Sequence, residues 1–286
     1  MSPCARATGS PLPSTWTRPS PSIPAAKRGS PEPVAGVALI TGGHRGIGLG
    51  IARALDAAGW RIAIASELPE DHAEVVEARA ALPAARYHRL DVASPADHDT
   101  VLERIEGTLG RVTTLVSNAG VAAQARGDLL EVSADSFDRC MDVNARGAFF
   151  LAQAVARRML ASPDDAGGPR SLIFVTSVSA SMASITRGEY CVSKAAAGMV
   201  AQLFALRLAP HGIAVYDLRP GIIETAMTAG VRTAYDDRIA GGLVPAGRWG
   251  TPDDIARAVL PLARGDLAFA TGSVIALDGA LSVARL

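Results

Sequence analysis

Short apolar runs alternate with longer helix-like stretches along the chain from residue 34 onward. Short runs rich in Val, Ile, Leu and Ala are typical of strands that are buried on both faces of a sheet. The runs that predict strands are residues 37–41, 61–65, 85–90, 114–117, 171–177, 213–218 and 273–277. Strands that alternate with helices in this way predict an α/β fold, with a mainly parallel sheet of about seven strands and helices on both faces.

Helix-starting residues stand between these runs. Ser133 can cap a helix that begins before Phe137, and Pro252 fits the first turn of a helix over residues 253–263. No internal repeat and no second linker interrupts the pattern. Residues 34–286 are therefore expected to form a single doubly wound domain of about 250 residues.

Residues 1–33 differ in composition from the rest of the chain. They contain eight prolines and six serines, with almost no large apolar side chains. Burial cannot offset the entropy of ordering such a segment, so we expect a disordered tail. Its Ser- and Arg-rich start is also typical of an organelle transit peptide, although the prolines would break the amphipathic helix that such a signal needs.

Composition argues against several classes of function. Basic and acidic residues balance at 28 each, and no basic stripe with interleaved aromatics occurs, so nucleic-acid binding is not expected. The sequence has no run of about 18 apolar residues, so a membrane span is not expected. The three cysteines lie far apart in the sequence, which suggests neither a disulfide framework nor a metal site and favours the reducing cytoplasm.

The first predicted strand runs directly into a glycine-rich turn, Thr41-Gly42-Gly43-His44-Arg45-Gly46-Ile47-Gly48. Glycines let the backbone approach a pyrophosphate, and the amide groups at the start of the following helix attract its charge. The spacing is Gly-x3-Gly-x-Gly, which differs from the Gly-x-Gly-x2-Gly of ordinary Rossmann dehydrogenases. The turn therefore predicts a dinucleotide site on a Rossmann-type sheet.

The end of the second strand bears on the choice of coenzyme. Glu67 can accept a hydrogen bond from a ribose 2'-hydroxyl and would repel a 2'-phosphate, which favours NAD(H). Arg45 and the small hydroxyl of Ser66 favour NADP(H). The two sets of signals conflict, and the balance lies slightly toward NADP(H).

Two further strand ends fit the same ligand. Asp91, followed by Val92, stands where a carboxylate can accept a hydrogen bond from an adenine amino group. Asn118, Ala119 and Gly120 follow the fourth strand. Their small size would let a coenzyme lie across the sheet edge.

One pair of residues predicts chemistry. Tyr190 and Lys194 stand four positions apart at the start of a predicted helix, so the ammonium can reach the phenol. The chain has 26 arginines but only two lysines, Lys27 and Lys194, which indicates that an ammonium is needed there. Ser177 closes the preceding strand and would face the same edge. Asn144 lies inside a predicted helix, which either a polar task or a core hydrogen bond would explain.

The tyrosine is a candidate general acid. A free tyrosine has a pKa of about 10, and general acid catalysis is most efficient when the pKa approaches the operating pH. A desolvated ammonium, a helix N-terminus and a cationic nicotinamide ring would together lower the pKa of Tyr190.

Taken together, these motifs resemble those of the short-chain dehydrogenase/reductase family. The motifs are the turn at residues 41–48, Asn118-Ala119-Gly120, Asn144, Ser177, Tyr190-x3-Lys194 and Arg219-Pro220-Gly221, and the likeness covers residues 36–282. Within the family the chain looks most like the bacterial 3-oxoacyl-carrier-protein reductase-like members. It departs from the family pattern at Ser117, in place of an Asn, and at Ala280, in place of a Gly.

The resemblance implies a role for each catalytic residue. Tyr190 would be the general acid or base, Ser177 would hold the substrate carbonyl, and Asn144 would anchor a water of the proton relay. Lys194 would bind the nicotinamide ribose and lower the pKa of Tyr190. Besides His44, Gly48, Ser66, Glu67, Tyr190 and Lys194, the expected coenzyme site comprises Gly42, Arg45, Gly46, Ile47, Asp91, Val92, Asn118, Ala119, Gly120, Pro220, Gly221, Ile223 and Thr225.

Two segments carry further expectations. Residues 222–245 are Gly- and Thr-rich, and the family uses this region as a mobile substrate lid. The helix after Lys194 is apolar nearly all round over residues 195–204, which suits a partner subunit in a homodimer or homotetramer.

The leading hypothesis is an NAD(P)(H)-dependent oxidoreductase that interconverts a ketone and a secondary alcohol, as a 3-oxoacyl-thioester-like or other carbonyl reductase. The alternative is an NAD-dependent dehydrogenase that oxidises a polyol, a sugar or a steroid-like alcohol. A hypothesis of a different class is a catalytically idle, nucleotide-sensing subunit that keeps the fold. The expected partner is a small-molecule carbonyl or alcohol, with neither nucleic acid nor a membrane.

Overall fold

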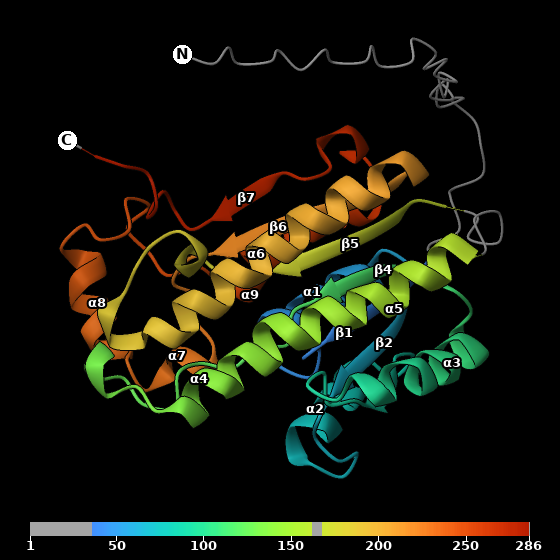
Figure 1. Cartoon of the computed structure of the whole chain (residues 1–286), viewed down its shortest axis with the longest axis horizontal. Helices are drawn as coiled ribbons and strands as arrows, with labels where there is room; N and C mark the ends of the chain where they lie inside the picture. The colour runs from blue at the N-terminus through green and yellow to red at the C-terminus, as the bar shows by residue number, and fades with distance from the viewer. Residues whose placement is uncertain (1–35, 162–167, 286) are drawn as a thin grey trace, which may run out of the picture. The chain divides into compact units, whose positions relative to one another are not determined.

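A parallel sheet forms the centre of the domain (Figure 1). The computed structural model describes residues 36–161 and 168–285. Within these residues the sheet has seven strands: β1 (Val37–Thr41), β2 (Arg61–Ser66), β3 (Arg86–Arg89), β4 (Val112–Ser117), β5 (Arg170–Val175), β6 (Ile213–Pro220) and β7 (Val274–Leu277). The prediction of a mainly parallel sheet of about seven strands is confirmed.

The strands lie in the order β3-β2-β1-β4-β5-β6-β7, and each neighbouring pair is parallel. β1 therefore has β2 on one side and β4 on the other, so the direction of winding reverses between β1 and β4. Ligands of doubly wound sheets bind at such a switch point, outside the carboxyl ends of the strands.

Helices cover both faces of the sheet. On one face, α3 (His98–Leu109), α5 (Ala148–Ala161) and α6 (Gly188–Leu208) pack against the strands, and α5 and α6 lie side by side (Figure 1). On the other face are α1 (Gly46–Ala57) and α9 (Pro252–Ala263). The remaining α-helices are α2 (Ala73–Ala81), α4 (Ala134–Met141), α7 (Ala226–Ala229) and α8 (Arg232–Ala240).

Shorter helical turns connect these elements. Single 3₁₀ turns occur at Pro95–Asp97, Leu129–Glu131, Val178–Ala180, Ile185–Arg187, Ala209–His211 and Ala268–Ala270. Asp142–Gly147 is a π-helix that joins α4 to α5. A π-helix is rare and often marks a functional position.

The predicted helix starts agree with the structure. The Ser133 side chain caps α4 by accepting a hydrogen bond from the Ser136 amide at 3.2 Å. Pro252 opens α9, where Thr251 and Asp254 form a capping box.

Apart from β1, the strands differ from the predicted bounds by one or two residues, and the carboxyl ends of β5 and β6 differ by two. β6 continues two residues past the predicted end at residue 218, because Arg219 and Pro220 still pair with β7. β5 ends at Val175, two residues before the predicted end, because the Ser177 side chain caps the turn Val178–Ala180. Ser177 is therefore in a loop at the sheet edge rather than in the strand.

Residues 222–245 contain α7 and α8, although the sequence shows few helix signals there. Thr225 and Thr228 supply a reciprocal cap that starts α7. The predicted tail, residues 1–33, lies outside the described residues.

One helical segment of the described chain, Ile185–His211, is long and apolar enough to cross a bilayer by length and composition alone. In the structure 44% of its most apolar window is buried inside the fold, and α6 packs against β6, α4 and α5. A core helix passes the same test, so the segment is weak support for a membrane span.

The two phenylalanines Phe174 and Phe269 test the core on the α6 face. We expect Phe174→Ala to lower the free energy of unfolding by about 3–5 kcal/mol, because burial and packing are both lost. The Phe174 ring is 1% exposed and lies 6.3 Å from the Phe204 ring, centroid to centroid. Phe269→Ala is the matched control, since that ring is 99% exposed. Denaturant unfolding measures both, and equal effects would contradict this assignment of the core.

Candidate active site

A cavity of about 1050 Å³ opens at the carboxyl ends of the strands. The loops that follow β1 to β6 all contribute to its wall, as expected for a switch-point site. Its lining includes the predicted coenzyme residues Gly42, His44, Arg45, Gly46, Ile47, Ser66, Glu67, Asp91, Val92, Asn118, Ala119, Gly120, Tyr190, Lys194, Pro220, Gly221, Ile223 and Thr225. Ser177 lines the same cavity. Residues that are far apart in the sequence thus meet at one site.

The glycine turn has the backbone that the spacing predicts. Gly42 and Gly46 have positive φ angles of 63° and 52°, which residues with a Cβ rarely adopt. A Cβ on Gly48 would lie 2.2 Å from the carbonyl oxygen of Gly42. Gly48 is not in the cavity lining, so its place is beneath the turn, where it permits close packing, rather than on the wall that faces a coenzyme.

The end of β4 is tied to the glycine turn. The Thr41 hydroxyl accepts hydrogen bonds from the amides of Asn118 and Ala119, each at 3.0 Å. The Asn118 side chain donates to the Thr41 carbonyl oxygen at 2.9 Å. These bonds hold the two sides of the switch point together and leave the small residues Ala119 and Gly120 facing the cavity.

Arg45 and Ser66, the two residues that favour a 2'-phosphate, lie at the end of the cavity away from Tyr190. Both side chains already have hydrogen-bond partners within the protein. The Arg45 guanidinium donates to both carboxylate oxygens of Glu74, at 3.1 and 3.2 Å. The Ser66 hydroxyl hydrogen-bonds the Tyr87 hydroxyl at 2.7 Å. Glu67 is exposed at the cavity wall, and no ion pair engages its carboxylate within the described residues.

His44 lies beneath Arg45 and is only 4% exposed. Burial lowers the pKa of its imidazole, and the neighbouring Arg45 charge acts in the same direction. The Nε2 atom lies 3.5 Å from the Glu74 carboxylate. Glu74, which the sequence gave no reason to single out, therefore contacts two residues of the glycine turn.

Tyr190 and Lys194 meet as their spacing predicts. The Lys194 ammonium is 5% exposed, donates to the Val175 carbonyl oxygen at 3.2 Å and lies 5.8 Å from the centroid of the Tyr190 ring. A Cβ on Gly120 would lie 3.2 Å from this ammonium and 3.1 Å from the Asn144 side-chain oxygen. Lys194 and Asn144 therefore meet behind the backbone of Gly120.

Ser177 is next to this group. Its hydroxyl accepts a hydrogen bond from the Ser179 amide at 3.0 Å. A hydrogen bond between Ser177 and Tyr190 lowers the pKa of the phenol. The hydroxyl and the phenol thus lie within reach of one substrate atom.

The pKa values differ from the expectation for the tyrosine. Burial raises the pKa of Tyr190, and the Ser177 hydrogen bond and the Arg187 charge oppose this only in part. The side chains alone therefore do not lower the pKa of Tyr190, because desolvation of the phenolate outweighs the neighbouring cations. Burial lowers the pKa of Lys194 to about 8, and the Asp217 carboxylate opposes the shift.

The Asp217 carboxylate belongs to a buried network behind Lys194. Asp217 is 2% exposed, accepts a hydrogen bond from the Thr176 hydroxyl, and accepts another from the Arg219 Nε at 2.9 Å. The sequence does contain a sign of this network, because Asp217 stands within an otherwise apolar strand. A carboxylate buried at such a position requires a hydrogen-bonding or charged partner.

Asn144, which is an unfavourable residue for an α-helix, lies in the π-helix Asp142–Gly147. Its oxygen accepts from the Val121 amide at 2.8 Å. Its nitrogen donates to the Val121 carbonyl and to the Ser193 hydroxyl, both at 2.9 Å. Both N–H donors are thus used within the protein, and the side chain fastens the loop after β4 to α6. Water binding by Asn144 stays a prediction.

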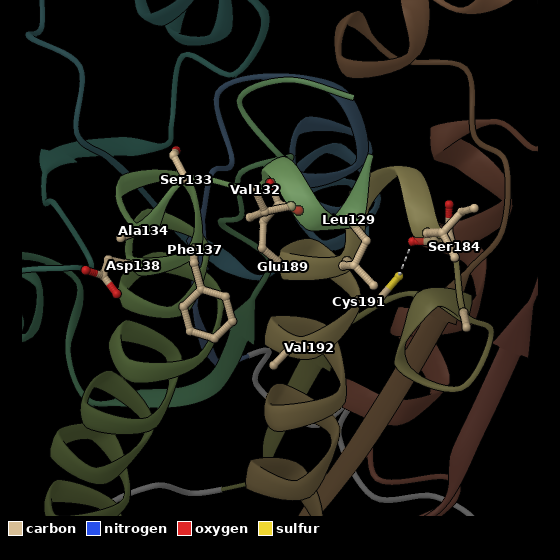
Figure 2. A pocket seen from close by; sticks show the side chains of 13 residues that line it. Leu129, Val132, Ser133, Ala134, Phe137, Asp138, Ser184, Glu189, Cys191 and Val192 are labelled. Atoms are coloured by element: carbon tan, nitrogen blue, oxygen red, sulfur yellow. Dashed lines mark hydrogen bonds between the residues drawn. The ribbon is translucent and has the colours of Figure 1, made fainter. Parts of the chain in front are cut away.

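A second cavity, of about 690 Å³, lies between α4 and the start of α6 (Figure 2). Apolar side chains such as Leu129, Phe137 and Val192 make up much of its wall. Cys191 lines it and is half-buried, and its thiol contacts the carbonyl oxygen of Ser184 at 4.0 Å. Cys191 therefore points away from the tyrosine, as the helix geometry predicts.

The substrate side of the large cavity contains residues that sequence reasoning missed. They include Arg126, Met182, Arg187, Tyr235, Arg238 and Leu243. They come from three loops or helices that lack a shared motif, so only the fold brings them together. Among the described residues, no group of three or more His, Cys, Asp or Glu side chains is placed to hold a metal ion.

A doubly wound sheet with a glycine turn and a Ser–Tyr–Lys cluster defines an oxidoreductase that uses a nicotinamide nucleotide. A family model described as "Enoyl-(Acyl carrier protein) reductase" matches residues 42–282. The chain belongs to the short-chain dehydrogenase/reductase family.

Known proteins of the family are similar over most of the chain. Galactitol 2-dehydrogenase of Agrobacterium fabrum is 33% identical over 254 residues, which is 85% of this chain and 96% of that protein. The 3-oxoacyl-[acyl-carrier-protein] reductase MabA of Mycobacterium tuberculosis is 33% identical over 251 residues, 86% of this chain and 92% of that protein. A Brucella melitensis 3-oxoacyl-[acyl-carrier protein] reductase, crystallised with NAD, is 46% identical with a TM-score of 0.84 and covers 88% of this chain and 99% of its own.

The low pKa of Lys194 is directly measurable because the chain has only two lysines. In protein labelled with ¹³C-lysine, we expect a side-chain signal that titrates near pH 8, below the ordinary range of a lysine. Lys194→Met should remove this signal and so assign it. Asp217→Asn should lower the pKa of Lys194 further, because the carboxylate that favours the charged form is lost. A Lys194 signal that titrates at the ordinary value of a lysine would contradict the buried ammonium.

Proposed function

We propose that this oxidoreductase reduces a ketone to a secondary alcohol, with Tyr190 as the proton donor. The observation that carries the proposal is the meeting of Tyr190, Ser177 and Lys194 at the wall of the large cavity. When bound, the nicotinamide ring would supply the hydride.

The chain's own residues account for the remaining tasks. The Ser177 hydroxyl would donate to the substrate carbonyl oxygen and orient it toward the phenol. Tyr190 would give its proton to the same oxygen as negative charge develops there. The Lys194 ammonium would donate to the ribose hydroxyls of the coenzyme, and Asn144 would keep the loop after β4 in place.

The protonation of Tyr190 in the free protein fits the role of a proton donor. Because burial raises the pKa of the phenol above its ordinary value, Tyr190 carries its proton at neutral pH. The reductases among the relatives favour the reductase hypothesis over the alternative of a polyol, sugar or steroid-like alcohol dehydrogenase, although a galactitol dehydrogenase is also among the relatives.

The idle-subunit hypothesis has little support. A chain that only sensed nucleotides would have no need to bury an ammonium, which costs free energy unless it is compensated. Here Lys194 is 5% exposed next to a tyrosine and a serine that share the cavity. The named relatives are reductases and dehydrogenases.

For the coenzyme we propose NAD(H). The residues that favoured NADP(H), Arg45 and Ser66, are engaged by Glu74 and Tyr87. A 2'-phosphate would have to break the Arg45–Glu74 pair and would meet two carboxylates, Glu67 and Glu74. The Brucella relative was crystallised with NAD, which agrees with this choice.

For the substrate lid we propose residues 222–245. Ile222, Tyr235, Arg238 and Leu243 from this segment line the cavity. Ile223 at its start belongs to one of the two sheet cores. Farther along, Ile239 and Val244 pack with Val178 and Leu281 in a small cluster that is separate from those cores. A small core of this kind allows local opening without loss of the sheet.

A homo-oligomer is the proposed assembly. Met199, Leu203 and Leu206 on α6 are each more than half exposed, and Phe150 on α5 adds to the apolar surface. Such a surface is typical of a subunit interface.

The described cysteines, Cys140 and Cys191, are free thiols, which fits the reducing cytoplasm that we propose as the compartment.

Substitution of Tyr190 tests the proposed proton donor. We expect Tyr190→Phe to lower kcat for ketone reduction by about 10²–10⁴-fold, because the general acid is lost. Coenzyme affinity, measured by fluorescence titration, should stay close to that of the wild type. Tyr216→Phe is the control, since that buried phenol donates to Leu267 away from the cavity. Near-normal turnover by Tyr190→Phe would refute the assignment.

Substitution of Glu74 tests the proposed coenzyme choice. We expect the wild type to prefer NADH, and Glu74→Gln to raise kcat/KM for NADPH relative to NADH by roughly 10-fold, since a freed charged donor contributes about 1.5–3 kcal/mol. Adding Arg45→Ala should cancel the gain. Glu70→Gln removes a nearby carboxylate that pairs with Arg79 instead, and it should leave the ratio unchanged. A wild type that prefers NADPH would overturn the proposal.

A further inference from the structure

Four arginines that line the large cavity lack a carboxylate partner in the described chain. Arg139 on α4 donates to the Ala122 carbonyl oxygen at 3.3 Å. The other three are Arg126 in the loop after β4, Arg187 just before α6, and Arg238 on α8. In residues 36–161 and 168–285, no carboxylate lies within 4.0 Å of any of the three guanidinium groups. At the other end of the cavity, Arg45 is paired with Glu74.

The contrast is not caused by a lack of acids nearby. Asp135, Asp138 and Asp142, on α4 and just after it, line the same cavity. None of them forms an ion pair with the three arginines in the described chain. The three guanidinium groups are therefore without a carboxylate partner in the described chain. Arg187 instead lies over the Tyr190 ring and Arg238 over the Tyr235 ring, which leaves their N–H donors available to an anion.

Two of the arginines come from segments that touch. The Gly127 amide donates to the Thr186 carbonyl oxygen at 3.3 Å, so the residues next to each, Arg126 and Arg187, lie on adjoining stretches of backbone. The two side chains therefore start from neighbouring backbone positions, and both line the same cavity. A carboxylate or a phosphate can accept hydrogen bonds from guanidinium groups in a bidentate fashion.

Arg187 is also close to the reacting group. Its guanidinium carbon lies 5.5 Å from the centroid of the Tyr190 ring, and the residue is half-buried. An anion held by Arg187 and Arg126 would therefore lie a few bonds from a carbonyl positioned at Tyr190 and Ser177.

We infer that the substrate is a ketone that carries an anionic group, such as an oxo acid, held by Arg187 and Arg126. This inference rests on the proposed reductase function and adds the class of substrate. The anion would fix which end of the molecule enters first and so align the carbonyl with the phenol. A neutral polyol would supply no anion to these guanidinium groups.

Paired substrates provide the test. The wild type is assayed with a series of straight-chain oxo acids of increasing length, each beside its uncharged methyl ester. We expect at least one acid to exceed its ester more than 10-fold in kcat/KM, because hydrogen bonds to charged groups contribute about 1.5–3 kcal/mol. A keto phosphate and its dephosphorylated form, assayed together, show whether phosphate serves as the anion. Preference for the uncharged member of every pair overturns the inference.

Variants then assign the anion to its arginines. Arg126→Gln should lower kcat/KM for the preferred acid by about 10–100-fold and leave the ester unchanged, since only the charged contact is lost. Arg187→Gln should do the same and should also move the pH profile of both substrates upward, because its charge lowers the pKa of Tyr190. Arg257→Gln, an exposed arginine on α9, is the control. An equal loss for acid and ester in Arg126→Gln overturns the inference.

A binding measurement separates this inference from the proposed function. Calorimetry with NAD present compares hexanoate with hexanamide, neither of which reacts. Tighter binding of hexanoate that Arg126→Gln abolishes supports the anion site even if no ketone is turned over, in which case only the proposed reductase function fails. Equal binding of the two compounds overturns the anion site.

Discussion

The site depends on the burial of one positive charge. An ammonium removed from water is unfavourable, and the fold offsets this at Lys194 with the Val175 carbonyl oxygen and, through space, the Asp217 carboxylate. Asp217 is itself held by Thr176 and Arg219. The compensation is incomplete, because the pKa of Lys194 is still lowered to about 8. The ribose hydroxyls that we propose as ligands of Lys194 would complete the environment of the ammonium.

The two ends of the large cavity differ in whether their charged side chains already have partners within the protein. At the end next to the glycine turn, Arg45 and Ser66 have protein partners, and an acidic residue faces the cavity. At the end next to Tyr190, Arg126, Arg187 and Arg238 have no carboxylate partner among the described residues, and Arg187 lies over the Tyr190 ring. The proposals of NAD(H) as coenzyme and of an anionic substrate both rest on this comparison.

The sequence predicted the fold well because parallel strands that are buried on both faces are continuous apolar runs. It also identified Tyr190, Lys194, Ser177 and the glycine turn, since each belongs to a local motif. The pairing of Arg45 with Glu74 was not predictable, because 29 positions separate the two residues and no periodicity links them. The raised pKa of Tyr190 was likewise hidden, since desolvation depends on the whole surroundings and not on neighbours in the sequence.

The π-helix between α4 and α5 has a consequence for how a guest molecule is accommodated. The Asn144 side chain, which the π-helix carries, hydrogen-bonds both the N–H and the C=O of Val121. These bonds tie the start of the loop after β4 to the helices. Farther out, that loop is held by single bonds at Gln124 and Gly127. The wall beside the reacting atoms is therefore stiff, while the outer wall is free to adjust. Substitutions in the outer part of this loop can therefore alter which substrate is accepted, while the residues beside the reacting atoms keep their positions.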